Sequence, residues 1–299
     1  MANAVVPIES LSPDRRARFK ALTATPAFAW PALALWALVM TVYVGSDVLA
    51  FAGRIPLWLG MLANSVIGYL AFTVTHDAIH RSISRTTWLN DAIGQTTVFI
   101  GAPYVDLRLF RWAHIRHHRY ANGPKDPDWV LHGAAWTLPL RWMLIDVFYL
   151  IHALRHADPV SSRYLKSSLL LGAATALVFG VLIANGYGSH VLMLWFLPSR
   201  LIFLMLGFSF FWLPHVPHDT PQEENFTRAT TVRLGHEWLL APLLQCQHVH
   251  LMHHLFPMTP FHRNGALWRL LEPELRQNDL SIQHGFAIQP THYRAPGPA

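Results

Sequence analysis

The sequence is poor in cysteine and in charge. Its one cysteine, Cys246, excludes both an intrachain disulfide and a cysteine-rich metal cage. Only 13% of the 299 residues are charged, against roughly 25% in soluble domains. Hydrophobic residues make up 52%. This balance favours a single membrane-embedded body over one or two soluble domains.

Four apolar segments are long enough, or nearly so, to cross a bilayer, which needs about 20 residues. They cover residues 27–51, 56–75, 165–184 and 191–213. Gly45 and Asp47 predict that the first segment ends slightly early. Turn-forming residues at 52–55 and 185–188 predict that the four spans pair as two membrane hairpins.

Two further apolar segments are too short to span. Residues 93–109, interrupted by Gly101 and Pro103, predict a re-entrant or interfacial helix. Residues 142–154 predict an amphipathic helix lying on the membrane. The predicted fold is therefore an all-α integral membrane protein with four transmembrane helices as two hairpins and a helical cap.

Lysine and arginine predict the orientation of these spans. The N-terminal segment carries four of them and the loop between the second and third spans carries ten, whereas the two turns carry only Arg54. The positive-inside rule then places both termini and the central loop in the cytoplasm. The net charge of +6 lies beside apolar spans, which indicates anionic lipid headgroups rather than nucleic acid as its partner.

The predicted boundaries follow from this topology. Residues 1–26 form a cytoplasmic N-terminal segment, residues 27–276 form one membrane domain, and residues 277–299 form a C-terminal tail. The Pro- and Gly-containing part of the tail after Tyr293 is expected to be disordered.

Histidine occurs in three spaced clusters, which are His76-Asp-Ala-Ile-His80, His114-Ile-Arg-His117-His118 and His250-Leu-Met-His253-His254. Residues three and four apart are neighbours on a helix surface, and neutral imidazole is the commonest protein metal ligand. His215 follows the fourth span. All of these residues fall on the predicted cytoplasmic side, so they predict one shared metal-binding region.

The number of imidazoles favours two metal ions. A tetrahedral zinc site closes with four ligands, whereas the clusters and His215 supply nine. The sequence lacks the His-Glu-x-x-His pattern of zinc proteases and the Glu-x-x-His pairs of carboxylate-bridged di-iron bundles. Iron, copper and zinc all suit histidine ligands, and the spacing does not choose among them.

The order of the three clusters resembles that in the membrane fatty acid desaturase superfamily, and most closely its carotene hydroxylase and ketolase branch. The first cluster followed by Ser82, and the segments 125–128, 213–217 and 250–257, carry the resemblance. Phe211 departs from it, since acyl desaturases often have an amide-bearing residue four positions before the ligand that ends the fourth span.

The resemblance implies a set of site residues and two iron ions. The implied iron ligands are His76, His80, His114, His117, His118, His215, His250, His253 and His254. Asp77, Asp126 and Asp128 are implied as partners that orient these ligands. For the aspartates, helix capping and turn formation are the alternative roles. His218 and His248 stay open between ligand and orienting partner.

The implied reaction is an oxygen-dependent oxidation of an unactivated C–H bond, by hydroxylation or desaturation. The substrate is expected to be a membrane-dissolved carotenoid-like isoprenoid or, as the alternative, a fatty acyl lipid. No ferredoxin cysteines, flavin motif or haem-binding domain is present, so electrons are expected from a separate ferredoxin-like donor.

Two other functional classes compete with an oxidase. A histidine-rich metal transporter is expected to place its ligands near the bilayer midplane, whereas these lie at span ends. A membrane-bound hydrolase needs a general base, and no glutamate lies beside the clusters. Arg200, a charge inside the fourth span, predicts either snorkelling to the membrane surface or a structural or substrate role.

Overall fold

The computed structural model describes residues 5–296 and divides the chain into two compact units. The helical unit contains residues 27–115 and 133–208. The mixed unit contains the described residues of 1–26, 116–132 and 209–299.

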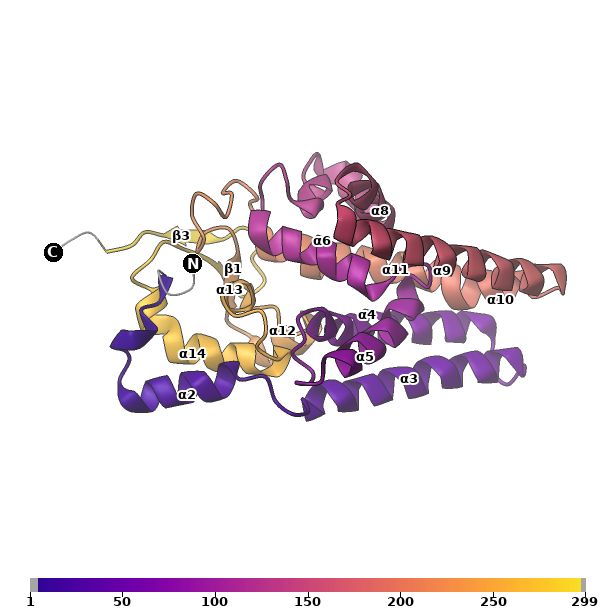
Figure 1. Ribbon diagram of the computed structural model, residues 1–299, viewed down its shortest axis with the longest axis horizontal. Coiled ribbons are helices and arrows are strands. Elements are labelled where there is room, and N and C mark those ends of the chain that lie inside the picture. The colour runs from indigo at the N-terminus through magenta and orange to yellow at the C-terminus, as the bar shows by residue number, and fades with distance from the viewer. Residues whose placement is uncertain (1–4, 297–299) are drawn as a thin grey trace. The chain divides into compact units, whose positions relative to one another are not determined.

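The helical unit contains the long apolar helices. Its helices are α3 (Trp30–Phe51), α4 (Leu57–Ile79), α5 (Thr87–Gly101), α7 (Leu138–Met143), α8 (Ile145–Arg155), α9 (Pro159–Ala184), α10 (Gly188–His190), the π-helical turn η4 (Val191–Phe196) and α11 (Leu197–Leu206). Helix α6 (Leu107–Tyr120) begins in this unit and continues into the mixed unit. Helices α3 and α4 pack side by side (Figure 1).

Four helical segments are long and apolar enough to cross a membrane, as predicted: Trp30–Phe51, Leu57–Ile79, Pro159–Ala184 and Gly188–His215. The expectation that the first ends early is wrong, since α3 continues through Gly45 and Asp47. Asn64 of α4 donates from Nδ2 to Oδ1 of Asp47 and to the carbonyl oxygen of Leu194, each over 2.8 Å. Because Asn64 donates a hydrogen bond to its carboxylate, Asp47 is accommodated inside the helix and does not end it.

The third span begins at a capping box rather than at residue 165. Oδ1 of Asp158 accepts hydrogen bonds from the backbone N–H groups of Val160 and Ser161, over 2.8 and 2.7 Å. Oγ of Ser161 accepts one from the backbone N–H of Asp158 over 2.9 Å. These bonds satisfy amides of the first turn, which have no partner within the helix.

Neither short apolar segment forms one continuous helix. Residues 93–109 are divided between α5, which ends at Gly101, and α6, which begins at Leu107. Residues 142–154 are divided between α7 and α8, and the axis bends by 79° at this break. The single helices predicted for both segments are therefore wrong.

The mixed unit contains both helices and a small sheet. Its α-helices and strands are α2 (Pro13–Thr23), β1 (Thr231–Leu234), α12 (Glu237–Leu243), α13 (His250–Leu255), α14 (Asn264–Leu275), β2 (Leu280–His284) and β3 (Thr291–Tyr293). Strand β1 pairs parallel to β2, with Thr231 opposite Ser281. Strand β3 pairs antiparallel to β2, with Tyr293 opposite Leu280.

This sheet was not predicted, and it corrects the all-α expectation. Leu280 and Ile282 of β2 lie in the same buried apolar cluster as Leu251 of α13 and Leu271 of α14. Ala295 belongs to the tail that was expected to be disordered. Its backbone N–H donates to a carboxylate oxygen of Asp279 over 2.7 Å. Residues 297–299 lie outside the described residues.

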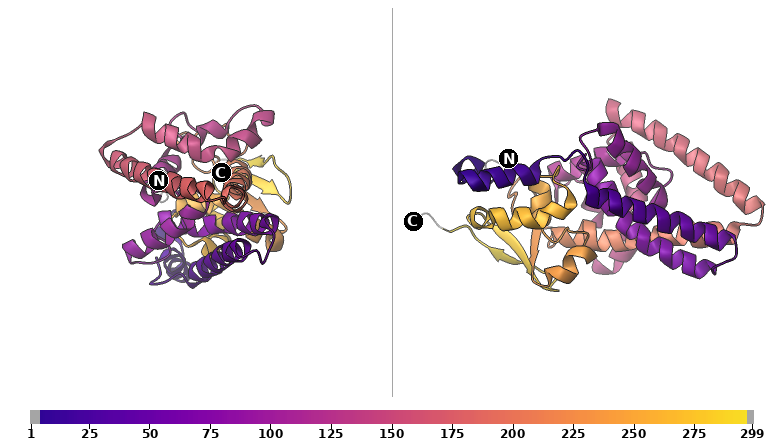
Figure 2. Two further views of the ribbon diagram at one scale, coloured as in Figure 1. Left: turned by 90° about the vertical axis from the view of Figure 1, so that its right-hand side faces the viewer. Right: turned by 90° about the horizontal axis from the view of Figure 1, so that it is seen from below.

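Helix α2 packs against α14 in the mixed unit (Figure 2). The guanidinium of Arg15 donates to both carboxylate oxygens of Glu274, each over 2.6 Å. Bidentate contacts of this kind fix orientation as well as adding energy. The N-terminal segment is thereby attached to the helix that follows the third histidine cluster.

Candidate metal centre

The helical unit brings together three of the predicted histidine ligands. His76 lies in the last turn of α4, His80 caps the end of that helix, and His114 lies on α6. Their rings are mutually 4.9–5.0 Å apart between centroids. Nε2 of His76 lies 3.2 Å from Nε2 of His114, and both residues are buried. We call this group the α4–α6 cluster.

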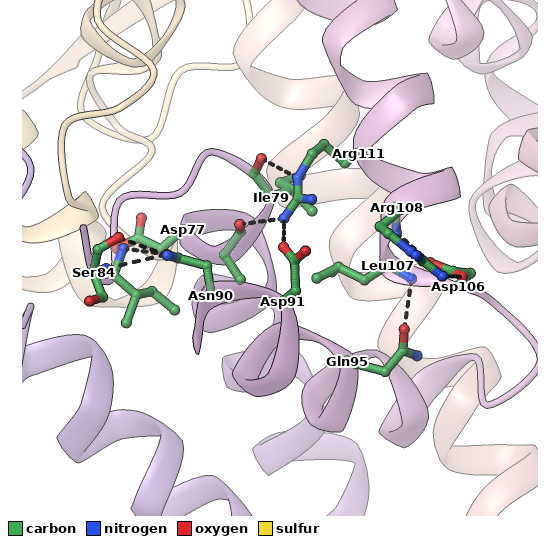
Figure 3. A network of polar contacts seen from close by, with 12 residues as sticks. Asp77, Ile79, Ser84, Asn90, Asp91, Gln95, Asp106, Leu107, Arg108 and Arg111 are labelled. Atoms are coloured by element: carbon green, nitrogen blue, oxygen red, sulfur yellow. Dashed lines mark hydrogen bonds and ion pairs between the residues drawn. The ribbon is translucent and has the colours of Figure 1, made fainter. Parts of the chain in front are cut away.

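Arg111 holds the two helices of this cluster together (Figure 3). Lying three residues before His114 on α6, it donates from Nε to the carbonyl oxygen of Ile79 over 2.8 Å. Its Nη2 donates to the carbonyl oxygen of Ala78 over 3.0 Å and to Oδ1 of Asp91 over 2.5 Å. The two carbonyls lie between His76 and His80, so one guanidinium fixes the end of α4 that bears the ligands.

The mixed unit brings together four histidines from three segments that are distant in sequence. Their ligand nitrogens all lie within 4.8 Å of one another and all four residues are buried: His117, His215, His250 and His254. Nε2 of His215 lies 3.2 Å from Nε2 of His250. We call this group the four-histidine cluster.

Three members of the four-histidine cluster direct Nδ1 away from its centre. Nδ1 of His250 lies 2.7 Å from Oε1 of Gln247, and Nδ1 of His254 lies 3.0 Å from Oε1 of Gln222. Nδ1 of His117 lies 2.9 Å from Oδ1 of Asp126. Because these oxygens are acceptors, each Nδ1 carries a hydrogen, and Nε2 is the ring nitrogen left to bind a metal.

Asp126 and Asp128 were predicted to orient a ligand, and both contact His117. Oδ2 of Asp128 lies 3.2 Å from its Nδ1. Burial lowers the pKa of His117, but the two carboxylates outweigh burial and raise that pKa to about 9. The same negative potential that favours a proton on His117 favours a metal cation bound to it.

His254 has the opposite electrostatic environment. Burial is the largest cause that holds the pKa of His254 well below its usual value, and repulsion from the neighbouring imidazoles lowers it further. Among residues 5–296, its Nε2 is buried with no hydrogen-bond partner. A metal ligand must be deprotonated, so this imidazole is already in the form that binds a metal.

The remaining predicted ligands form a pair in the mixed unit. Nε2 of His118, on α6, lies 2.9 Å from Nε2 of His253, on α13. The side chain of Gln222 connects the same two helices, because its Nε2 donates to the carbonyl oxygen of His118 over 2.5 Å while its Oε1 accepts from His254.

These nitrogen positions fit a bound first-row metal. Two imidazole nitrogens at about 2.0–2.1 Å from one ion, subtending 90–109°, lie about 2.9–3.4 Å apart. The three Nε2 pairs lie 2.9–3.2 Å apart. The donor set is rich in imidazole and contains no thiolate, which suits iron, copper or zinc.

The other candidate residues are His218, His248 and Asp77. Within residues 5–296, neither His218 nor His248 belongs to a group of converging ligand nitrogens. The ring of His218 contacts that of His132, with centroids 4.6 Å apart, and burial lowers the pKa of His218 to about 3. Asp77 is buried on α4, where its backbone carbonyl accepts from the backbone N–H of Ser82 over 2.9 Å.

Arg200 has a carboxylate partner in the helical unit. Its Nη2 lies 2.7 Å from Oδ2 of Asp146, at the start of α8, and its Nη1 donates to the carbonyl oxygen of Met143 over 2.8 Å. Tyr104 also donates to Asp146. This ion pair ties the fourth span to the bend between α7 and α8, which favours the structural role.

Gln222, Gln247 and Arg111 were missed from the sequence. Amides are common in loops and carry no distinctive spacing, and the partner of Gln222 on α6, His118, is 104 residues away. Gln247 lies in the turn three residues before His250, and a spacing of three residues was the local signal that could have pointed to it.

Comparison with known proteins decides the family. The sequence model described as fatty acid desaturase matches residues 52–286, which contain every predicted ligand. The chain belongs to the fatty acid desaturase family. It is therefore an oxidoreductase, and its four apolar spans make it an integral membrane protein.

Individual relatives agree with this assignment. A beta-carotene ketolase from a Paracoccus species (strain N81106) is 28% identical over 248 residues, covering 81% of this chain and 86% of its own. A second one, from Paracoccus strain PC1, is 27% identical over 257 residues, covering 83% and 89%. The dihydrorhizobitoxine desaturase of Bradyrhizobium elkanii is 26% identical over 235 residues, covering 68% and 65%.

Proposed function

We propose that this membrane oxidase hydroxylates or ketolates a carotenoid-like isoprenoid, using dioxygen and two iron ions. The buried four-histidine cluster, with three Nδ1 atoms paired to acceptors, carries the proposal. The two ketolase relatives, each covering more than four fifths of this chain, support the substrate class.

A fatty acyl lipid is the second candidate substrate. The description of the family favours it. A histidine-rich metal transporter, by contrast, has no support among these relatives.

The nine histidines predicted as ligands are proposed to bind the two ions. The four-histidine cluster binds one. The α4–α6 cluster supplies ligands of the other. Bound iron would supply the dioxygen chemistry that oxidises a C–H bond.

The protein's own residues hold these ligands in place. Asp126, Gln222 and Gln247 fix the tautomer of three imidazoles, and fixed orientation is what permits one C–H bond to be selected. Asp128 adds negative potential at His117. Asp77 is proposed to assist the α4–α6 cluster, whose supporting guanidinium is Arg111.

The proposed topology has two membrane hairpins, with α3 and α4 as the first and the third and fourth spans as the second. Both termini and the metal-binding segments face the cytoplasm, and residues 27–276 act as one catalytic domain. The uneven distribution of lysine and arginine supports this orientation. A separate ferredoxin-like protein is proposed to deliver electrons there.

Expression in two hosts tests the substrate. The chain is produced in a carotene-accumulating host and in a host that reports acyl-lipid products, and extracted lipids are analysed by mass spectrometry. New oxygenated carotenoids support the proposal. Acyl chains that have lost two hydrogens, with carotenes unchanged, support the second candidate and overturn the first.

A further inference from the structure

The mixed unit exposes an apolar patch beside its sheet. Four large side chains form it: Trp238 and Leu243 of α12 are 80% and 54% exposed, and Phe286 and Ile288 of the turn after β2 are 65% and 46% exposed. The two parts are adjacent, because the ring of Phe286 stacks on that of His236, just before α12, at 5.2 Å.

Four of the apolar residues of α12 share one side of the helix. At 100° per residue, Trp238, Leu239, Pro242 and Leu243 fall within one arc. Leu240 is buried on the other side. Glu237 also falls outside the arc, and its carboxylate accepts a hydrogen bond from the backbone N–H of Gly235 over 2.7 Å. The exposed arc is therefore apolar without a charge in it.

A hydrogen-bonded connection places this patch beside the end of a membrane span. The fourth span ends at His215. Nε2 of the buried Gln283 donates to the carbonyl oxygen of Leu213 over 3.2 Å and to that of Ile288 over 2.6 Å. One side-chain amide thus joins the end of the span to the turn that carries Phe286 and Ile288.

We propose that the apolar patch lies in the bilayer interface and anchors the mixed unit on the membrane. Tryptophan and phenylalanine beside a span end are typical of this depth, where one side of a segment meets acyl chains. An exposed apolar group of this size on a soluble surface would otherwise need a protein partner. The inference rests on the membrane spans and not on the proposed substrate.

Site-specific fluorescence tests the proposal. In a Cys246→Ser background, single cysteines are introduced by Phe286→Cys, Leu243→Cys or Gln277→Cys, labelled with an NBD fluorophore, and the full chain is reconstituted into phosphatidylcholine vesicles containing phosphatidylglycerol. Gln277 is an exposed polar residue of the same unit and serves as the matched control. Each label is quenched separately by iodide in water and by lipids with a doxyl group near the headgroup.

Labels at Phe286 and Leu243 should emit at shorter wavelength than the control and be quenched by doxyl lipid about twofold more strongly or better. Quenching by iodide alone, as at Gln277, would overturn the proposal. Protection from both quenchers that disappears when the protein is diluted with empty vesicles would also overturn it, because it indicates a second copy of the chain. Two labelled positions keep the test valid if one variant does not fold.

Discussion

Nδ1 of His117 lies 2.9 Å from a carboxylate oxygen of Asp126, which follows nine residues later. Both side chains are almost completely buried, and Asp126 also accepts hydrogen bonds from the backbone N–H groups of Asn122 and Asp128, each over 2.9 Å. The loop after α6 therefore returns a carboxylate to the helix that bears the second histidine cluster.

Replacing Asp126→Asn removes the charge that pairs with His117 while keeping the side-chain volume. Partners of this type are worth about 10–100-fold in metal affinity, and we expect a loss of that size in iron binding, measured by competition with a chelator. Asp219→Asn, at a carboxylate that is mostly exposed, should bind iron like the wild type. Equal affinity in all three proteins would contradict the assigned role.

Gln247 should act only as an acceptor for Nδ1 of His250. Gln247→Ala removes the acceptor, and we expect iron affinity to fall about tenfold or more. Gln247→Glu keeps an oxygen in the same place and should retain most of the affinity. If the two variants lose iron equally, the amide contributes by packing and not by orienting the imidazole.

Arg111→Ala should destabilise the helical unit. The substitution leaves the carbonyl oxygens of Ala78 and Ile79 without their guanidinium, and hydrogen bonds to a charged group contribute about 1.5–3 kcal/mol each. We expect a loss of at least about 2 kcal/mol in the free energy of unfolding, measured in detergent. Arg108→Ala removes a guanidinium whose side chain is 48% exposed and should cost less than Arg111→Ala.

Arg200 and Asp146 should be coupled. Removing one partner of a buried pair leaves the other charge uncompensated, which costs about 3–5 kcal/mol, so Arg200→Met and Asp146→Leu should each destabilise strongly. The double variant should recover much of the loss, because no unpaired charge remains. A double-mutant cycle on thermal unfolding measures this coupling, and additive losses would show that the pair is not energetically linked.

Hydropathy was enough to predict much of the fold. Much of the rest depends on contacts between residues that are far apart in the sequence. Twenty or more apolar residues identify a span whatever its partners are, which is why the four spans were predicted correctly. Strand β2 is only five residues long and its parallel partner β1 lies some 50 residues earlier. No local pattern marks such a pairing, so the segment containing Gln283 was predicted to be a tail.

The histidines and the supporting residues differ in the same way. Spacing of three and four residues marks His117 and His254 as neighbours of other ligands within their own helices. Gln222 contacts His254 from 32 residues away, and Asp146 contacts Arg200 from 54 residues away. Those contacts exist only after the chain folds, whereas the spacing within each histidine motif can be read directly from the sequence.

The central claim is that the histidine clusters bind two iron ions that consume dioxygen. Metal content of the purified protein by plasma mass spectrometry, combined with oxygen uptake in the presence of a reductant and lipid, tests it most directly. We expect two iron ions per chain and oxygen uptake, both retained in His284→Ala and both lost or strongly reduced in His117→Ala and His253→Ala. A protein that contains zinc alone and takes up no oxygen, or an equal loss in all three variants, would contradict it.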